Sequence, residues 1–479
     1  MCMRSIGTCE YKVIVILNKY YHLMNNNISS DSDSDSSSTS MEYIDKFSDE
    51  SESKSEDDEP IKQTRSPSEL INHLNDLNLD KFKKSQYIRR EKRIVEIKSI
   101  PQHEQKSVKW LKQRETCLTA TAIAIALDED PYKTPAYLLL DKCGRCPKFV
   151  ANKFTHHGNK YETIASMYYS FRNNINMAEY GMIKHSKQKF IGASPDGICE
   201  RSTLDGKGLS SLVGRLLEIK CPACRPIKFI GDLDGDRCPH QYFVQVQTQL
   251  FVTEMDECDF LQCKITEYES WEEYLSDSDK EIPTLSKKTH LEKGCIIQLL
   301  PRKLNSGFGT VWNTDIECID STDPEITDEY LKHLFEAKYI YPPKLHMNPT
   351  EIKDWIRDQV MNYHVHDLYR THMIDRVIYF RFDVVSCNLI EADTKWFEAQ
   401  LPLLKQFWTY IEFYKKHPNR LNKLVIYVKE IGIDKTKEIF EHVHREYLKF
   451  NKKSKYQPLY QTKNPWRVKY DNKIKKIDI

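Results

Sequence analysis

Two short segments, GASPDG at Gly192–Gly197 and LEIKCP at Leu217–Pro222, decide how this chain of 479 residues folds. In the second segment, Glu218 and Lys220 are two positions apart, so on a strand both side chains project from one face. In the first, a proline and a glycine flank Asp196, which places it at a turn next to a strand. The two segments therefore predict adjacent strands that bring two carboxylates and an ammonium group together.

Two carboxylates on neighbouring strands supply the oxygen ligands that Mg²⁺ or Mn²⁺ prefers. Such a cation lowers the pKa of a bound water and offsets charge on a phosphate. Lys220 could orient or deprotonate that water and stabilise the transition state. Glu162, in the upstream segment HHGNKYE, adds a carboxylate from a helix, either to complete the shell of this ion or to hold a second one. The combination favours a metal-dependent site more strongly than the ExK triplet alone, which many exposed strands contain.

The pattern of apolar residues around these segments predicts an α/β core with a mixed central sheet flanked by helices. The expected helices are Trp110–Arg114, Thr119–Leu127, Ala151–Phe171 and Gln241–Glu254, and the expected strands are Phe190–Ala193, Gly197–Glu200, Arg215–Lys220 and Cys258–Thr266. Glycines and polar residues between Asp196 and Glu218 indicate a flexible insertion. Further along, Ile378–Val385 is typical of a strand and Thr394–Tyr414 of an amphipathic helix.

Composition divides the chain into four parts. They are an acidic, Ser/Asp-rich disordered tail at 1–60, a basic linker or helix at 61–106, a catalytic core at 107–285, and a C-terminal extension of that core at 286–479 to which no role is assigned. The tail has too few apolar residues to offset the entropy of ordering it. Met24 opens its Asn-rich stretch, so the working protein starts either at Met1 or at Met24.

The net charge of +1 conceals an uneven distribution of charge. Residues 31–59 hold 12 acidic and 2 basic residues, and removing their net −10 leaves +11 on the rest. A basic body suits a polyanionic partner. The chain has no run of eighteen apolar residues, so no membrane span is expected. Its 14 cysteines lack regular spacing, which indicates reduced thiols in an intracellular protein.

Several other features leave alternatives open. The basic segment Lys81–Arg93 is either a solvated helix face or a contact for the DNA backbone. The basic and aromatic residues of Lys452–Lys476 either line a nucleic-acid strand or belong to a packed tail. Two CxxC pairs, Cys143/Cys146 and Cys221/Cys224, could hold zinc or an iron–sulfur cluster, although no further ligand completes a compact set. His156 and His157 are expected to shape the pocket or to contact DNA, and His240 is assigned no role.

The segments HGNKYE, GASPDG, LEIKCP and YFVQVQ occur in an order that resembles the phage lambda exonuclease type of PD-(D/E)xK nucleases, the viral recombinase (YqaJ-like) family. The resemblance covers Trp110 to Glu254 and implies a restriction-endonuclease-like core. It implies that Asp196 and Glu218 are metal ligands, with the backbone carbonyl of Ile219 as a third and Glu162 as the helix carboxylate. Lys220 would be the catalytic lysine. Gln245 would brace the site, with Gln247 as a weaker candidate.

The upstream segment WLKQRETCLTAT resembles the part of the family that shapes a pocket for a 5′-terminal phosphate. The resemblance places Arg114 at the phosphate-binding position, where a guanidinium grips phosphate oxygens in a fixed fork. Thr121 takes the place of a serine hydroxyl, and Ser194 adds another hydroxyl donor. Taken alone, Arg114 could equally form a surface salt bridge. Its spacing from the following TAT segment, Thr119–Thr121, favours the phosphate pocket.

The resemblance implies a 5′-to-3′ exonuclease that acts on double-stranded DNA in viral recombination, repair or genome processing. It also implies an annealing protein that coats the remaining single strand, and a homo-oligomer, since compact relatives form rings around DNA. The long extension and the Asn-, Ile- and Lys-rich composition suggest a large DNA virus, and hence the host cytoplasm, a replication site or the virion. The alternatives are a structure-selective endonuclease with the same core and a catalytically silent DNA-binding protein.

Overall fold

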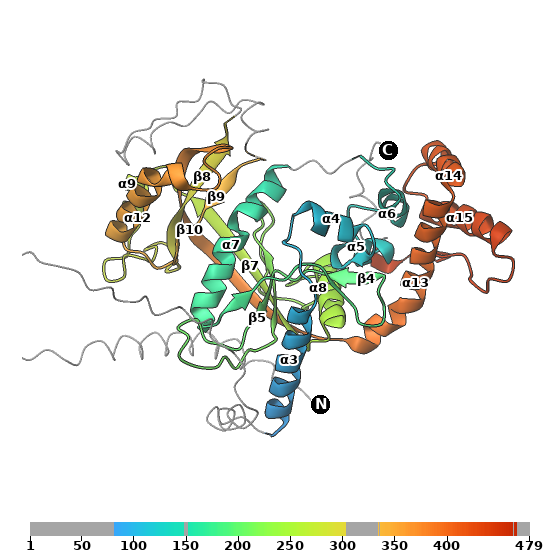
Figure 1. Ribbon diagram of the computed structural model, residues 1–479, viewed down its shortest axis with the longest axis horizontal. Helices are drawn as coiled ribbons and strands as arrows, with labels where there is room; N and C mark the ends of the chain where they lie inside the picture. The colour runs from blue at the N-terminus through green and yellow to red at the C-terminus, as the bar shows by residue number, and fades with distance from the viewer. Residues whose placement is uncertain (1–80, 148–151, 303–333, 335, 463, 467–479) are drawn as a thin grey trace, which may run out of the picture. The chain divides into compact units, whose positions relative to one another are not determined.

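Seven strands form one mixed sheet in the computed structural model (Figure 1). Their order is β2 (Met177–Ala178), β5 (Gly197–Cys199), β6 (Leu216–Lys220), β7 (Glu257–Glu267), β10 (His372–Glu391), β8 (Lys293–Pro301) and β9 (Lys338–Ile340). The structure describes residues 81–147, 152–302, 334, 336–462 and 464–466. The predictions for residues 1–60, including the choice between Met1 and Met24, fall outside these ranges.

The core helices and strands predicted from the sequence are present, with ends that differ by no more than two residues. The helices are α4 (Val108–Arg114), α5 (Ala120–Ala126), α7 (Lys153–Asn173) and α8 (His240–Thr253). A second, three-stranded sheet has the order β1 (Leu118–Thr119), β4 (Ile191–Ala193) and β3 (Ile183–Lys184). The predicted mixed α/β architecture with flanking helices is therefore confirmed.

Strand β6 lies between an antiparallel and a parallel neighbour. Gly197 of β5 pairs with Leu217, so Asp196 sits immediately before this pairing. On the other side, β6 runs parallel to β7, from Leu216 opposite Cys258 onward. Parallel neighbours need a long crossover connection, and α8 lies within the segment that joins β6 to β7. This arrangement places α8 against the strand that carries Glu218.

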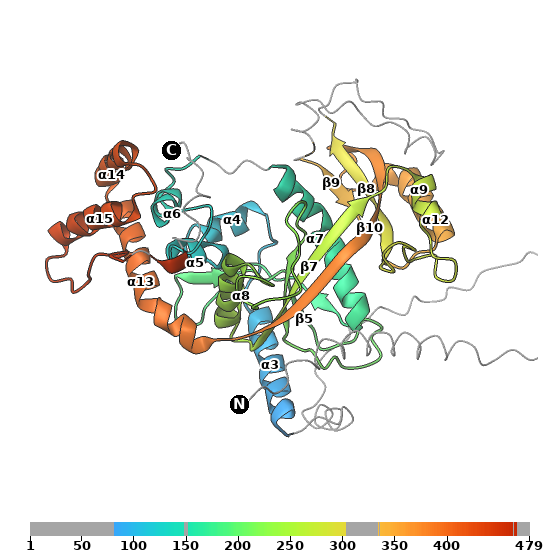
Figure 2. The same cartoon turned by 180° about the vertical axis from the view of Figure 1, so that it is seen from behind.

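The alternation of side chains along β6 assigns each of its faces to a different helix. Leu217 and Ile219 pack in one apolar cluster with Tyr161 of α7. Leu216 packs in another cluster with Val244 of α8. Figures 1 and 2, seen from opposite sides, show α7 in front of the sheet in one view and α8 in front in the other. Glu218 and Lys220 share the face of Leu216, so they point toward α8.

The sheet continues across residue 285, where the sequence had suggested the end of the catalytic core. Strand β10 is 20 residues long and pairs antiparallel with β7 along Phe380–Glu391 and with β8 along His372–Arg381. The sequence predicted only Ile378–Val385 as a strand, because pairing with two different neighbours is not a local property. Without β10, the central strand β7 would become an exposed edge.

After β10, the chain forms three helices that pack on the predicted core. They are α13 (Thr394–Lys416), α14 (Pro418–Ile431) and α15 (Thr436–Phe450). Phe407 of α13 and Phe440 of α15 share one apolar cluster with Ile123 of α5 and Leu139 of α6 (Pro135–Lys142). Both views show these helices beside α5 and α6 (Figures 1 and 2). Near the other end of β10 lie α9 (Trp271–Ser276), α12 (Pro349–Met361) and the 3₁₀ helix η1 (Tyr363–Val365).

The basic segment Lys81–Arg93 lies in helix α3 (Lys81–Ser99), and its arginines bind the protein itself. Arg93 donates to the carbonyl of Thr253 at 2.8 Å, and Arg89 donates to the carbonyl of Glu254 at 2.9 Å. Arg90 lies 3.1 Å from carboxylate oxygens of Asp256 and Glu257. These cations satisfy carbonyls at the C-terminal end of α8, where positive charge is favourable. Arg90 and Arg93 are therefore largely buried against the protein, whereas the Arg89 side chain remains 47% exposed.

The described part of the C-terminal tail is packed. The Tyr460 hydroxyl donates to the carbonyl of Ala126, and the Trp466 ring stacks on His240 with centroids 3.6 Å apart. These contacts favour the packed interpretation over a nucleic-acid groove for these residues. Within the ranges that the structure describes, no helix is long and apolar enough to cross a membrane.

We expect Phe380→Ala to lower the free energy of unfolding by about 3–5 kcal/mol, since it removes a buried aromatic ring from the junction of β10 with β7 and β8. Phe380 is fully buried, with its ring 5.7 Å from that of Tyr161. Chemical denaturation would measure the change. The control is Leu389→Ala on the same strand, where the side chain is 42% exposed and a much smaller loss is expected. Equal losses would argue against β10 as part of the core.

Candidate active site

The carboxylate of Glu218 is the centre of the candidate site. It is completely buried on β6 and accepts hydrogen bonds from three side chains. Gln245 donates to its Oε1 at 2.6 Å, Gln249 donates to its Oε2 at 2.6 Å, and Lys220 donates to Oε1. Both glutamines come from α8, four residues apart and therefore on one helix face. The structure thus surrounds one buried negative charge with donors from a strand and a helix.

Asp196 lies beside this group at the start of β5. Its Oδ2 accepts the backbone N–H of Ile219 at 2.7 Å. Burial raises the pKa of Asp196 well above its usual value, and the nearby charge of Glu218 raises it further. Because Ile219 follows Glu218 and Gly197 pairs with Leu217, the structure places Asp196 beside Glu218.

Glu162 reaches the same site from α7. Lys106 lies 3.8 Å from its carboxylate. Burial raises the pKa of Glu162, the charges of Lys106 and Lys220 lower it, and Glu218 raises it again. Helix α7 begins with a capping box at Asn152, which fixes its start and therefore the position of Glu162 along the sheet.

Lys220 is held as a cation in this arrangement. Burial alone would lower its pKa, but the carboxylates of Glu218 and Asp196 raise it above the usual value. The ammonium also lies 5.0 Å from the centre of the Tyr242 ring, which offers its negative face. In this state Lys220 can orient a water or balance negative charge.

The donor chemistry of the site fits a hard cation. Asp196, Glu218 and Glu162 supply only oxygen ligands, and their mutual repulsion would be relieved by positive charge. No group of three or more His, Cys, Asp or Glu side chains among the described residues is already arranged around a metal position. Three donors occupy most of the roughly four lone-pair sites of Glu218. A cation would therefore compete with the ammonium of Lys220 for this carboxylate.

Gln247 does not take part in this site. Its amide donates to the carbonyl of Glu391 at 2.8 Å and accepts the backbone N–H of Asp393 at 2.8 Å. It therefore holds the junction of β10 and α13, because a shift of two residues turns a helix by about 200°. The second bracing residue is Gln249, which the sequence reasoning missed. The four-residue spacing from Gln245 was the signal that could have identified it.

The residues predicted to bind phosphate form a second group next to the carboxylates. The Arg114 guanidinium lies 4.4 Å from the centre of the Trp110 ring and donates to the Thr121 hydroxyl at 3.4 Å. The Trp110 indole N–H donates to the Ser194 hydroxyl at 3.1 Å. Ser194 is two residues from Asp196 in the same turn. Trp110 thus links the arginine to the segment that carries Asp196.

Comparison with known proteins identifies the family of the chain. The chain is 55% identical over 407 residues to the uncharacterized protein R354 of Acanthamoeba polyphaga mimivirus, which covers 85% of this chain and 70% of that relative. Residues 109–256 match the YqaJ-like viral recombinase domain. The chain belongs to this family. All of the predicted site residues lie within this recombinase domain.

Two solved structures are also similar to the chain. One is an alkaline exonuclease (LHK-Exo) from Laribacter hongkongensis, with 14% identity and a TM-score of 0.31. The other is the same enzyme in complex with dAMP, with 14% identity and a TM-score of 0.32. Each match covers 67% of this chain and 100% of the other.

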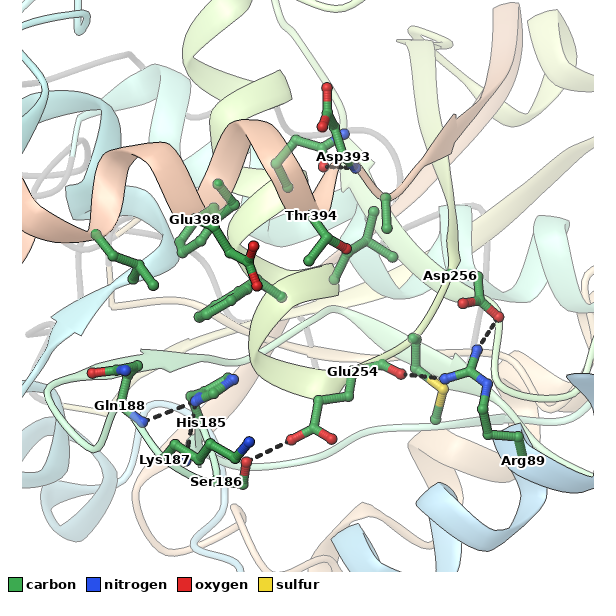
Figure 3. Close-up of a pocket in the computed structure, with 17 residues that line it drawn as sticks. Arg89, His185, Ser186, Lys187, Gln188, Glu254, Asp256, Asp393, Thr394 and Glu398 are labelled. Carbon is green, nitrogen blue, oxygen red and sulfur yellow. Dashed lines mark hydrogen bonds and ion pairs between the residues drawn. The ribbon is translucent and has the colours of Figure 1, made fainter.

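A separate pocket of about 400 Å³ lies between the end of α8 and the start of α13 (Figure 3). Its lining includes His185, stacked on Phe251 at 4.3 Å. Figure 3 shows Arg89 at its edge, joined to Glu254 and Asp256. The residues that line this pocket include Gln247 and none of those predicted to act in catalysis. This pocket is therefore distinct from the carboxylate cluster.

The histidines noted in the sequence have structural contacts. His156 is hydrogen-bonded to the Tyr339 hydroxyl at 2.7 Å, and the His157 ring packs edge-on against Tyr161. His240 opens α8 between Asp234, at 2.8 Å, and Glu129, at 3.0 Å. Burial lowers the pKa of His240, and its hydrogen bonds to these two carboxylates raise it above the usual value.

The two CxxC pairs have separate surroundings. The Cys143 thiol contacts the carbonyl of Ile411, and the Cys146 thiol contacts that of Tyr137. Cys221 lies with Cys263 in one buried apolar cluster. No group among the described cysteines and other metal-binding residues joins the pairs into a metal site.

We expect Asp196→Asn to stabilise the metal-free protein at neutral pH. Because the folded-state pKa of Asp196 is raised, wild-type stability should fall as the pH rises from about 3.9, the usual Asp value, toward that raised value. The amide carries no charge and can still accept the Ile219 N–H. Urea unfolding in EDTA at about pH 4 and pH 8 would show a difference between the two proteins that grows with pH. A difference independent of pH would contradict the assignment.

Proposed function

We propose that this chain is a metal-dependent deoxyribonuclease that degrades double-stranded DNA from its 5′ ends. The observation that carries the proposal is the convergence of Asp196, Glu218 and Lys220, with Gln245 and Gln249 fixing the Glu218 carboxylate. A buried, mutually repelling pair of carboxylates beside a lysine is costly for folding, so a catalytic reason for it is favoured. Membership of the YqaJ-like recombinase family supports the same conclusion.

Each residue then has a distinct task. Asp196 and Glu218 would hold Mg²⁺ or Mn²⁺, together with the Ile219 carbonyl, and Glu162 would complete the shell or hold a second ion. When bound, the cation supplies an acidified water and offsets phosphate charge. Lys220 would orient the attacking water and stabilise the charge of the transition state. The two glutamines keep Glu218 in place because their amides occupy both of its oxygens.

End recognition would decide polarity. Arg114, Thr121 and Ser194 offer a guanidinium and two hydroxyls, the donors that a terminal phosphate accepts. Trp110 links them to the turn that carries Asp196. A 5′-phosphate held there would present the adjacent phosphodiester to the carboxylates, and repeated capture of each new end would give 5′-to-3′ digestion.

The family relationship supports a role in viral recombination, repair or genome processing. Such an enzyme leaves a 3′-terminated single strand, so we propose an annealing protein as its partner. We also propose that copies of the chain assemble around the duplex. Digestion of linear duplex and closed circular DNA, with magnesium or with EDTA, tests the activity. Magnesium-dependent loss of linear DNA alone is expected, cutting of the circle would indicate an endonuclease, and tight binding without cutting would indicate a silent DNA-binding protein.

We expect Lys220→Met to reduce the cleavage rate by on the order of 10²–10³, comparable to the loss of one preorganised charge-stabilising donor. DNA binding measured in EDTA should change little. The matched control is Lys228→Met, which removes an exposed lysine paired with Asp236 and should leave the rate near that of wild type. Equal rates for the two variants would remove Lys220 from the chemistry.

We expect Arg114→Ala to slow digestion of 5′-phosphorylated ends by about tenfold or more, since it removes a charged hydrogen-bond donor. Ends with a 5′-hydroxyl should be affected much less. The comparison is Arg357→Ala, which removes an exposed arginine paired with Asp354 on α12. The same slowing on both kinds of end would eliminate the phosphate pocket.

A further inference from the structure

Helix α8 carries both glutamines of the candidate site, but its N-terminus has no side-chain cap. Its N-cap is Pro239, which forms no side-chain hydrogen bond there. At the opposite end, arginines of α3 hold the last carbonyls of the helix. The hydrogen bonds from Gln245 and Gln249 to Glu218 are 2.6 Å long, so a shift of α8 by about 1 Å would break them. Some other contact must therefore fix the start of α8.

The first residue of α8, His240, makes this contact through a buried pair of ionic hydrogen bonds. Its Nδ1 lies 2.8 Å from a carboxylate oxygen of Asp234, and its Nε2 lies 3.0 Å from one of Glu129. A neutral imidazole has a single N–H, so only the imidazolium can donate to both carboxylates. Burial lowers the pKa of His240, but the hydrogen bonds to the two carboxylates raise it above the usual value.

These three residues, the His240 cluster, join separate segments to the start of α8. Asp234 lies in the loop between β6 and α8, and Glu129 follows α5. The Trp466 ring of the C-terminal tail stacks on the imidazole with centroids 3.6 Å apart, an arrangement in which an indole face attracts a cation. Asn464 of the same tail donates to Glu129 at 3.2 Å. A charged His240 therefore holds the helix start against two loops and the tail.

The other charged groups of the loop before α8 have partners of their own. Asp236 pairs with Lys228 at 2.9 Å, and Arg237 donates to the Asn388 side chain at 3.2 Å. Helix α8 itself contains no Asp, Glu, Lys or Arg.

The segment after α5 and the tail add two more carboxylates and a phenol near the cluster. Asp130 accepts backbone N–H groups of the following turn. Asp128 acts on the pKa of Tyr460, which burial raises first and the Asp128 charge raises further. The groups that act on the pKa of His240 are instead Asp234 and Glu129, so these two set the pH at which the cluster loses its proton.

We propose that His240, as an imidazolium, is a positioning residue that sets α8 along the sheet so that Gln245 and Gln249 reach Glu218. The inference rests on the proposed function and adds a pH dependence to it. The cluster is complete below about pH 6.5, the usual His pKa, and is lost as the pH rises through the raised folded-state value. Above that value one carboxylate has no donor, and the start of α8 is released.

The test measures kcat and KM for digestion of linear duplex DNA with magnesium from about pH 6.5 to about pH 9.5. At the lower end, His240→Gln should reduce kcat by about tenfold or more, because small displacements near the reacting groups are costly. KM should stay within about twofold, because His240 binds no DNA in this proposal. The ratio of wild-type to variant kcat should fall toward one as the pH rises, since wild type then loses its imidazolium.

Two further variants accompany this measurement. Asp234→Asn keeps a partner for the ring but removes a charge, so the decline of kcat should move by about one pH unit or more toward lower pH. The matched control is His364→Gln, which changes an exposed histidine bonded to the Met361 carbonyl and should leave kcat near that of wild type at each pH.

A ratio for His240→Gln that is independent of pH, or a rise in KM alone, would overturn the proposal. Where His240→Gln does not fold, Asp234→Asn decides, since the Asp234 side chain is 34% exposed. A decline of kcat at the same pH in this variant and in wild type would then overturn it.

A readout without cleavage separates this inference from the proposed function. In metal-free protein with isotope-labelled glutamine, the side-chain amide NMR signals of Gln245 and Gln249 should move as His240 titrates and should stay in place in His240→Gln. Signals that move equally in both proteins, or in neither, would count against the positioning role. Wild-type protein that shows the movement but cuts no DNA with magnesium would instead remove the proposed function.

Discussion

The buried carboxylate of Glu218 is the constraint on which the rest of the site depends. An ionised group without solvent costs several kcal/mol unless charge and hydrogen bonds compensate for it. Gln245 and Gln249 from α8 and Lys220 from the same strand provide this compensation. Helix α8 must therefore lie against β6 in one register. Asp196 is less completely compensated, and burial, followed by the charge of Glu218, raises its pKa.

The same constraint explains why the site needs strands from distant parts of the chain. Strand β6 is stable because β7 pairs with it in parallel, and β7 is covered in turn by β10. The residues beyond 285 thus complete the sheet that positions Glu218. Helix α8 lies in the connection between the paired strands β6 and β7, so both of its ends are attached to the same sheet. The recombinase domain contains the predicted site residues, but the folded unit that supports them extends beyond this domain.

Segments outside the recombinase domain also complete its surface. Helix α3 places arginines on the carbonyls that end α8, where Arg93 contacts Thr253 and Arg89 contacts Glu254. On the other side, α13 brings Lys415 to the turn after α4. Both contacts tie segments from outside the recombinase domain to the ends of its helices.

Local spacing by itself determined the short strands, the helices that flank them and the pairing of Glu218 with Lys220, because side-chain direction repeats every two residues on a strand. It also located Asp196 at a turn and Glu162 on a helix. Only the tertiary structure decided that Gln249, and not Gln247, faces Glu218, since this depends on how α8 rotates against the sheet. The length of β10 and the approach of Lys415 were likewise set by contacts between residues far apart in the chain, which no local pattern encodes.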